Sequence, residues 1–408
     1  MPYLGLSKML PNQDLAGTQL NSTTHDLRQA EMAERELEGD LLAPSLDEKI
    51  AAIKAEIKAE YREPHEKPWI IGFSGGKDST LVLHLVVESL LELPSSKRTR
   101  PVYVVSNDTR VESPIVQDYV DGLLGFLAEA LVELRLPITV AKTTPQVDQT
   151  FWVNLIGRGY RSPTRLFRWC TDRMKIKPTA DFVRSKVSEN GEIILLLGVR
   201  RSESSARAAT ARRYDNGERL NAHNDINGCK VFRPILELNT DEVWEFLMSS
   251  RAPWGGDHDA LVQLYRDAVG GECPVVIDPD AQPSCGSSSI RFGCWTCTVV
   301  DKDKSFRSHI EKGYEDLVPM AEFRDWLKVF CYETTNRMTE RRNGAPGLGP
   351  LTFEARAEVL SRLLALQDTV RKPLISVDEV SQIKRIWGND QSTLLCRQAD
   401  KLINLLSD

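Results

Sequence analysis

Four short apolar runs in the first half of the chain predict buried strands. They span residues 69–73, 101–107, 137–142 and 192–199. Longer segments have apolar positions three and four residues apart, which predicts helices at 47–61, 81–93, 112–135 and 240–247. Strands that alternate with helices form a parallel sheet with helices on both faces. The pattern therefore predicts a doubly wound, mostly parallel α/β fold.

The second half of the chain has helical patterns at 306–332, 352–367, 377–387 and 390–406. We predict four segments. They are an N-terminal extension (1–46), a nucleotide-binding domain (47–250), a cysteine-rich region (251–335) and a C-terminal helical appendage (336–408).

Composition narrows the class of protein. A chain of 408 residues, 41% hydrophobic and 27% charged, is typical of a globular protein with about two domains. No apolar run approaches the ~18 residues of a membrane span. The first residues lack a signal-peptide pattern, so we expect a cytoplasmic protein with no membrane partner. The net charge of −6 excludes a wholly basic nucleic-acid binder, but basic patches remain at 158–173 and 200–213.

The first predicted strand leads into a glycine turn. The turn reads Ser74, Gly75, Gly76, Lys77, Asp78, Ser79. Between a strand and a helix N-terminus, such a turn predicts an anion site, because free N–H groups and the helix dipole point at it. Its spacing is too short for a Walker A motif. The alternative is an ordinary glycine turn capped by polar residues.

Two more polar clusters follow predicted strands. Asn107 and Asp108 follow the second strand, and Arg200 and Arg201 follow the fourth. Ligands of parallel sheets bind at the carboxyl ends of strands, so we expect both clusters to meet the glycine turn in one crevice. Guanidinium forks bind phosphate and sulfate bidentately. The arginine pair therefore predicts anion capture, with a solvated basic loop as the alternative.

Cys170 is the first candidate for sulfur chemistry. It precedes a predicted helix and is followed by Arg173, Lys175 and Lys177. Positive neighbours and a helix N-terminus both lower the pKa of a thiol, which would make a thiolate available. The alternative is a buried structural cysteine.

Four other cysteines predict a metal site. They are spaced C-x11-C-x8-C-x2-C and comprise Cys273, Cys285, Cys294 and Cys297. In a cytosolic chain such a cluster favours metal or redox chemistry over disulfides. Four thiolates suit tetrahedral zinc or a [4Fe–4S] cluster. The single C-x2-C pair favours iron–sulfur, but spacing alone leaves zinc and unliganded buried cysteines open.

Together these motifs resemble the PAPS reductase family of the PP-loop ATP pyrophosphatases, which cleave ATP between the α- and β-phosphates. The turn at 74–79 fits S-G-G-x-D-S, residues 170–178 fit C-T-x-x-x-K-x-x-P, and residues 198–204 fit G-x-R-x-x-E-S. Residues 232–244 resemble the family's P-I…D-V-W segment. Within the family, residues 68–80 and 292–300 are similar to the DndC-type sulfurtransferases of DNA phosphorothioation. The resemblance implies an adenine nucleotide alpha hydrolase-like fold with an iron–sulfur insertion and a C-terminal helical appendage.

The resemblance also implies roles for the candidate residues. ATP would bind with Mg²⁺ at Ser74–Ser79, with Asn107 and Asp108 beside it. Lys77 and Asp78 would be catalytic. Phosphates would be clamped by a set of four basic residues, Arg173, Lys175, Arg200 and Arg201. Sulfur would arrive through Cys170 or through a [4Fe–4S] cluster on the four cysteines, and we favour the cluster.

The implied reaction is ATP-dependent adenylation of a DNA backbone phosphate, followed by sulfur insertion. The implied partners are a cysteine desulfurase and ATPase-type and DNA-binding subunits, with DNA as the substrate. The chain lacks the C-terminal E-C-G-[IL]-H motif of assimilatory PAPS reductases. That absence disfavours the first alternative, a PAPS or APS sulfonucleotide reductase. The second alternative is a non-catalytic ATP and Fe–S scaffold subunit of a DNA-modification complex.

Overall fold

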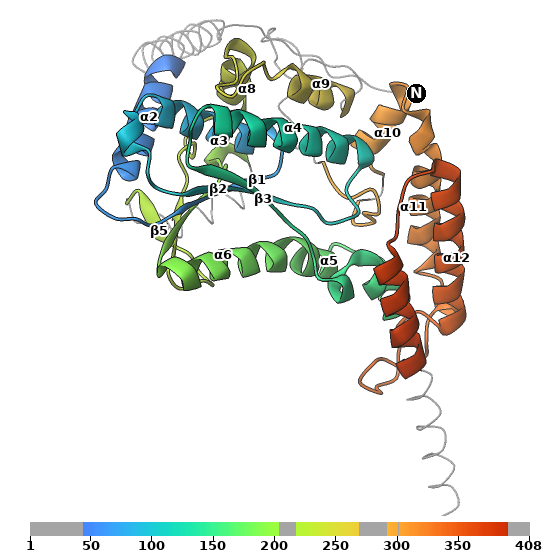
Figure 1. Ribbon diagram of the computed structural model, residues 1–408. Helices are drawn as coiled ribbons and strands as arrows, with labels where there is room; N and C mark the ends of the chain where they lie inside the picture. Colours follow the sequence, from blue (N-terminus) through green and yellow to red (C-terminus); the bar gives the residue numbers. More distant parts are fainter. Residues whose placement is uncertain (1–43, 204–217, 269–291, 301, 391–408) are drawn as a thin grey trace, which may run out of the picture. The chain divides into compact units, whose positions relative to one another are not determined.

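A six-stranded sheet organises the described part of the chain (Figure 1). The computed structural model describes residues 44–203, 218–268, 292–300 and 302–390. The strands are β1 (Trp69–Phe73), β2 (Val102–Asn107), β3 (Ile138–Thr143), β4 (Ile193–Leu196), β5 (Leu220–Ala222) and β6 (Cys229–Phe232). Their order is β3-β2-β1-β4-β6-β5, and every pair is parallel except β5–β6. The predicted mostly parallel sheet is confirmed.

The central strands form where the apolar runs predicted them. Four of the five residues of β1 are buried, and all four of β4 are. Strands covered on both faces need apolar residues throughout, which explains the continuous runs. The run predicted at 192–199 ends early as a strand, at Leu196. The short β5 and β6 were not predicted.

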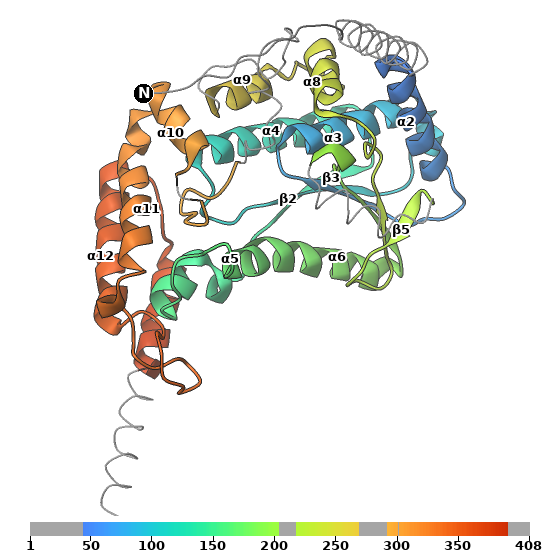
Figure 2. The same cartoon turned by 180° about the vertical axis from the view of Figure 1, so that it is seen from behind.

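Helices cover both faces of the sheet, as the doubly wound prediction requires. Figures 1 and 2 show α3 (Lys77–Leu91) and α4 (Pro114–Glu133) on one face and α6 (Lys177–Asn190) on the other. The remaining helices of this half are α2 (Leu46–Tyr61), α5 (Trp169–Thr171), α8 (Thr240–Ser249) and α9 (Asp259–Ala268). Helix α3 begins at Lys77, four residues before the predicted start at Leu81. The second half of the glycine turn is therefore the first turn of this helix.

The C-terminal helices build a second hydrophobic cluster. They are α10 (Lys304–Glu311), α11 (Val318–Phe330), α12 (Phe353–Val370) and a helix described from 377 to 390. The helix predicted over 306–332 is interrupted at Gly313, whose φ is +105°. The cluster's members include Phe151, Trp152, Ile156, Trp295, Leu327, Leu363 and Ile383. The predicted helices at 352–367 and 377–387 are confirmed, and the one at 390–406 lies almost wholly outside the described residues.

Residues 53–408 group into one compact unit and residues 1–52 into another. The segment boundaries after 250 and 335 remain predictions. Within the described ranges, no helix combines the length and the apolar character needed to cross a bilayer.

Candidate active site

The order of the strands defines a switch point between β1 and β4. From β1 the chain proceeds to β2 and β3 on one side, whereas β4 lies against the opposite edge of β1. In open parallel sheets ligands bind where the direction of winding reverses, beyond the carboxyl ends of the strands. The glycine turn follows β1 and the arginine pair follows β4. Two of the predicted clusters therefore lie at this point.

The glycine turn is shaped to receive an anion. Gly75 has a φ of +73°, and a Cβ there would lie 2.5 Å from Val120 Cγ2. The backbone N–H of Ser74 donates to Ser79 Oγ (3.2 Å), and that hydroxyl donates to the carbonyl of Gly76 (2.9 Å). Gly76 precedes α3, whose start has no side-chain cap. The N-terminal end of this helix is thus a site where N–H groups and the dipole favour negative charge.

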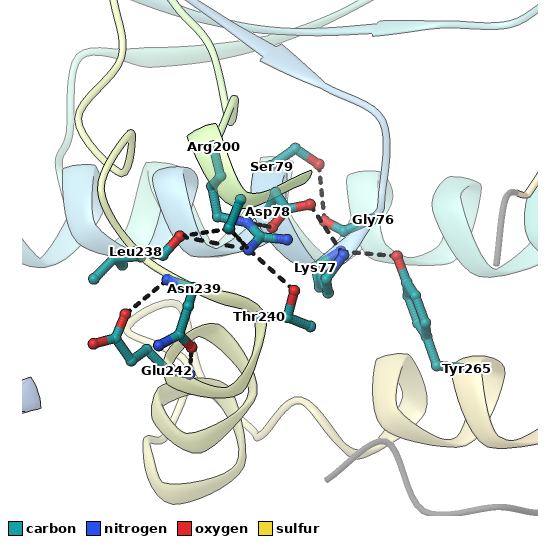
Figure 3. A network of polar contacts seen from close by, with 11 residues as sticks. Gly76, Lys77, Asp78, Ser79, Arg200, Leu238, Asn239, Thr240, Glu242 and Tyr265 are labelled. Carbon is teal, nitrogen blue, oxygen red and sulfur yellow. Dashed lines mark hydrogen bonds and ion pairs between the residues drawn. The ribbon is translucent and has the colours of Figure 1, made fainter. Parts of the chain in front are cut away.

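Asp78 joins the two positive side chains of the site (Figure 3). Its Oδ2 lies 3.1 Å from Lys77 Nζ, and its Oδ1 accepts a 2.6 Å hydrogen bond from Arg200 Nε. Arg200 is 1% exposed and also donates to the hydroxyls of Ser202 (3.0 Å) and Thr240 (3.2 Å). Because both carboxylate oxygens face cations, Asp78 holds Lys77 and Arg200 together at the start of α3.

The predicted arginine pair is divided between two environments. Arg200 points inward to Asp78, whereas Arg201 Nε bonds to Glu237 Oε1 at 2.6 Å near the surface. A solvent-exposed pair of this kind contributes little to stability. Arg200 is thus built into the site, while Arg201 lies at its margin.

Two residues of the site were missed from the sequence. A Cβ on Gly198 would lie 2.7 Å from the backbone of Asp78, so the loop after β4 touches the first turn of α3. Tyr265, on α9, accepts a hydrogen bond from the N–H of Lys77 (3.4 Å), and its ring centroid is 5.7 Å from Lys77 Nζ. Gly198 carried a signal, since it ends an apolar run before the arginines. No pattern in α9 marks Tyr265.

Asn107 and Asp108 have different contacts from those expected. Asn107 Nδ2 donates to the carbonyl of Met174 (2.9 Å). Asp108 accepts the N–H of Arg110 (2.7 Å) and lies 3.8 Å from Lys142 Nζ. These contacts tie the end of β2 to β3 and to residues 172–176, so neither side chain bonds to the glycine turn.

A second polar site lies beyond β2, where the cysteine segment docks. Cys294 forms a β-bridge with Glu112, and the N–H of Trp295 donates to the carbonyl of Val111 (3.0 Å). The N–H of Cys297 donates to the carbonyl of Cys294 (3.0 Å), which closes a turn between the two cysteines. The other two predicted ligands, Cys273 and Cys285, lie outside the described residues.

Cys170 belongs to this second site. Cys170 and Cys294 both pack against the hydrophobic cluster that contains Trp295. Cys170 lies in the three-residue α5, and helical residues 172–176 and α6 follow it, so the predicted helix after Cys170 is present. Burial, with a smaller contribution from nearby Cys297, raises the pKa of the Cys170 thiol. The predicted lowering of its pKa is wrong, because desolvation outweighs the hydrogen bonds of Thr171 and the Cys170 backbone, which lower the pKa.

A cation and a hydroxyl lie beside the thiols. Thr109 Oγ1 is 3.4 Å from Cys294 Sγ, and Lys175 Nζ is 3.3 Å from Glu112 Oε1. Burial and Glu112 raise the pKa of Cys294. Burial opposes the charge of Lys175, but Cys294 and Glu112 outweigh it and raise the pKa of this ammonium. Arg173 instead contacts Gln149 and Tyr160.

These contacts fit two positions of a thiolate-bound metal centre. A C-x2-C turn brings two thiols together, and metal binding releases their protons. The Thr109 hydroxyl donates to Glu112 Oε1 (2.9 Å), whereas the Lys175 ammonium suits the negative charge of bound thiolates. Among the described residues alone, no three His, Cys, Asp or Glu side chains are grouped closely enough to hold a metal ion.

Comparison with known proteins agrees with this architecture. The phosphoadenosine phosphosulfate reductase domain family matches residues 68–300, which is more than half of the chain. An uncharacterized protein of Methanocaldococcus jannaschii is 26% identical over 198 residues, which cover 48% of this chain and 35% of that protein. The chain thus spans about a third of the length of this curated relative.

Solved structures give only remote similarities. The phosphoadenylyl-sulfate reductase of Candida auris, in a phosphate complex, is 11% identical, with a TM-score of 0.29 over 50% of this chain and 86% of that one. The U34-tRNA thiolase NcsA of Methanococcus maripaludis, with its [4Fe-4S] cluster, is 12% identical, with a TM-score of 0.33 over 69% and 78%. These values are too low to assign an activity.

Proposed function

The chain belongs to the phosphoadenosine phosphosulfate reductase domain family, and on this premise we propose that it is a DndC-type sulfurtransferase. It would cleave ATP to AMP and pyrophosphate and so activate a DNA backbone phosphate for sulfur insertion. The observation that carries the proposal is the pairing of two sites on neighbouring strands. The anion site follows β1, and the site of Cys170, Cys294 and Cys297 follows β2.

In the activation step, a non-bridging oxygen of the DNA phosphate attacks the α-phosphorus of ATP. The bond from that phosphorus to the bridging oxygen breaks, and pyrophosphate leaves. Its developing charge faces the start of α3, the hydroxyls of Ser74 and Ser79, and Lys77. Donors fixed in advance at the place where charge develops are the largest contribution to such catalysis. Asp78 and Arg200 hold Lys77 in position.

In the second step, a sulfide-level nucleophile attacks the adenylated DNA phosphorus. The P–S bond forms as the bond to the AMP oxygen breaks, so AMP carries away the former phosphate oxygen. Lys175 would offset negative charge at this site. The buried ring of Trp295 excludes water, which would otherwise hydrolyse the adenylate.

The sulfur source divides the proposal into two routes. A [4Fe–4S] cluster, bound through Cys294 and Cys297 with Cys273 and Cys285, would supply a place for the incoming sulfur. The alternative carrier is Cys170, which would receive sulfane sulfur from a cysteine desulfurase as a persulfide. A thiol reductant would then attack the persulfide and supply two electrons, so that sulfide leaves for the DNA phosphorus and the thiol ends in a disulfide. The other partners we propose are ATPase-type and DNA-binding subunits, and Mg²⁺ would accompany the nucleotide phosphates.

The test is pyrophosphate release by the full chain with ATP, Mg²⁺, DNA and the partner subunits. Lys77→Ala should abolish pyrophosphate release and remove phosphorothioate from cellular DNA, as measured by mass spectrometry of nuclease digests. Lys97→Ala, at an exposed lysine of a short surface helix, is the matched control and should change neither. No pyrophosphate from the wild type, together with intact phosphorothioate in the Lys77→Ala cells, would refute the proposal.

The family match also favours a second candidate, reduction of a sulfonucleotide. That activity would release sulfite from PAPS or APS with thioredoxin as the reductant. Sulfite release without any requirement for DNA would favour it over sulfur insertion. Binding of ATP without turnover in the complete complex would instead indicate a scaffold.

A further inference from the structure

A tight turn beside the cysteine site exposes an apolar side chain among arginines. The N–H of Thr164 donates to the carbonyl of Phe167 (3.1 Å), and the N–H of Phe167 donates back to the carbonyl of Thr164 (3.2 Å). This turn places Arg165 and Leu166 at its tip. Leu166 is 98% exposed and Phe167 40%. We call residues 165–168 the arginine tip.

The residues on both sides of the arginine tip are held by packing and hydrogen bonds. Trp169 is buried, its ring stacks on Phe151 at 5.3 Å, and its Nε1 donates to the carbonyl of Arg161 (3.1 Å). The hydroxyl of Thr298 donates to the carbonyl of Pro163 (2.7 Å). Both ends of the turn are therefore fixed, one of them to the segment that carries Cys294 and Cys297. Leu166 is therefore exposed on a turn whose two ends are both fixed.

The segment that carries the tip is basic. Residues 158–177 contain seven arginines and lysines against one acidic residue, although Arg158 pairs with Asp148 and Lys175 pairs with Glu112. A distant segment adds to this charge, because the Arg342 guanidinium donates to the carbonyl of Arg158 and lies 5.0 Å from the ring centroid of Tyr160. The Tyr160 ring is in turn 6.2 Å from that of Phe167. Across the described residues, Arg165, Arg168 and Arg342 form no ion pair with a carboxylate.

We propose that the arginine tip docks duplex DNA, with Arg165, Arg168 and Arg342 on phosphates and Leu166 inserted between base pairs. This inference rests on the proposed function and deepens it. Unpaired arginines supply the phosphate contacts that dominate affinity for DNA. An exposed aliphatic side chain among them matches the wedges that proteins insert between base steps. A protein partner would instead need a larger contiguous apolar patch than one leucine.

The wedge has a consequence for the chemistry. Inserting Leu166 unstacks one base step and bends the duplex, which brings the adjacent phosphate out of the regular helix. The turn that holds Leu166 is fixed to the cysteine segment through Thr298. On this proposal the distorted phosphate is expected beside the turn that leads into Cys170, four residues after Leu166.

The first test is fluorescence anisotropy of a fluorescein-labelled duplex with the full chain, without ATP, over a salt series. Arg165→Ala and Arg168→Ala should each weaken binding about three- to tenfold, and each should reduce the slope of log K against log salt by about 0.9. Arg251→Ala, at an exposed arginine after α8, is the control and should match the wild type. Affinities and slopes unchanged in both tip variants would overturn the proposal.

The second test separates the wedge from the charges. A duplex that carries 2-aminopurine should brighten on binding the wild type, because unstacking relieves quenching. Leu166→Ala should lose that signal and keep the wild-type salt slope. Val132→Ala, at a valine of α4 that is 75% exposed, is the control for loss of exposed aliphatic methyl groups. An equal rise in fluorescence with Leu166→Ala contradicts the wedge.

The two proposals can fail separately. If the wild type releases pyrophosphate but the tip variants bind DNA normally, the docking surface is wrong and the proposed function stands. If DNA binding depends on the tip but Lys77→Ala leaves phosphorothioate intact, the activation chemistry is wrong. Loss of co-purifying subunits from the tip variants with normal DNA binding would assign the surface to a protein partner and overturn the docking proposal.

Discussion

Gly198 is the position where one added methyl group should disturb the candidate active site most directly. The loop after β4 crosses the first turn of α3 there. A Cβ on Gly198 would lie 2.7 Å from the carbonyl carbon and oxygen of Asp78 and 2.9 Å from the amide nitrogen of Ser79. All three are backbone atoms, so no side chain can rotate away. Gly198→Ala must therefore move either the loop or the start of α3.

Two opposing free energies set the size of the effect. Overpacking of a close contact costs about 1–3 kcal/mol. Replacing glycine also restricts the unfolded chain, which stabilises the fold by about 0.4–1 kcal/mol. The net expectation is a loss of about 0–2.6 kcal/mol in the free energy of unfolding. The rate should fall further, because a shift of about 1 Å in a positioned group costs about 100-fold, and Asp78 holds both Lys77 and Arg200.

The assays are urea unfolding and pyrophosphate release by the full chain. Gly122→Ala is the matched control, since a Cβ at this exposed position of α4 meets nothing within 4 Å. Removing glycine from a helix interior should stabilise by about 0.5–1 kcal/mol and leave the rate unchanged. If Gly198→Ala unfolds at the wild-type urea concentration and releases pyrophosphate at the wild-type rate, the contact between the loop and α3 does not position the site.

Three further outcomes are expected. Arg200→Met leaves the Asp78 carboxylate without its buried partner and should lower the free energy of unfolding by about 2–4 kcal/mol, measured by urea midpoints. Burial lowers the pKa of His84 to about 3 and also lowers the pKa of His258, whose Nε2 lies 3.0 Å from His84 Nδ1. Because the unfolded histidines have a pKa near 6.5, this contribution to the free energy of unfolding should be full above that pH and fall as the pH drops from 6.5 to 5. His84→Phe should flatten this pH profile, measured by urea titrations. Anaerobically purified protein should absorb broadly near ~400 nm, and Cys294→Ser should remove the band, whereas a colourless metal-containing protein would indicate zinc.

The central strands of the sheet were predictable because their burial requires a continuous apolar run in the sequence. Central parallel strands are buried on both faces, so β1 and β4 must be continuously apolar, and the chain shows this directly. The short strands β5 and β6 at one end of the sheet have three and four residues and include Asn221 and Lys230, so they lack that signal. β6 pairs with β4 and β5 pairs with β6, and the sequence does not show that these segments lie beside one another.

The pattern of charged residues in the sequence does not predict which partner each charged side chain has in the fold. Arg200 and Arg201 are adjacent in the sequence, yet one is buried on Asp78 and the other pairs with Glu237 at the surface. Only the fold assigns these partners. In the same way, the basic neighbours of Cys170 were visible in the sequence. Its burial was not, and burial decided the direction of the pKa change.

The register of the sheet bears on whether the two sites can share one substrate. Phe73, the last residue before the glycine turn, pairs with Ser106 of β2, and neighbouring strands lie about 4.8 Å apart. From Ser106 the chain reaches Thr109, which touches Cys294, in three residues, a span of at most about 11 Å. The end of β2 is also tied to the Cys170 segment by the bond from Asn107 to Met174. Phe73 and Thr109 are therefore at most about 16 Å apart, so on the proposed function a phosphate adenylated at the glycine turn has a short distance to cover to the cysteines.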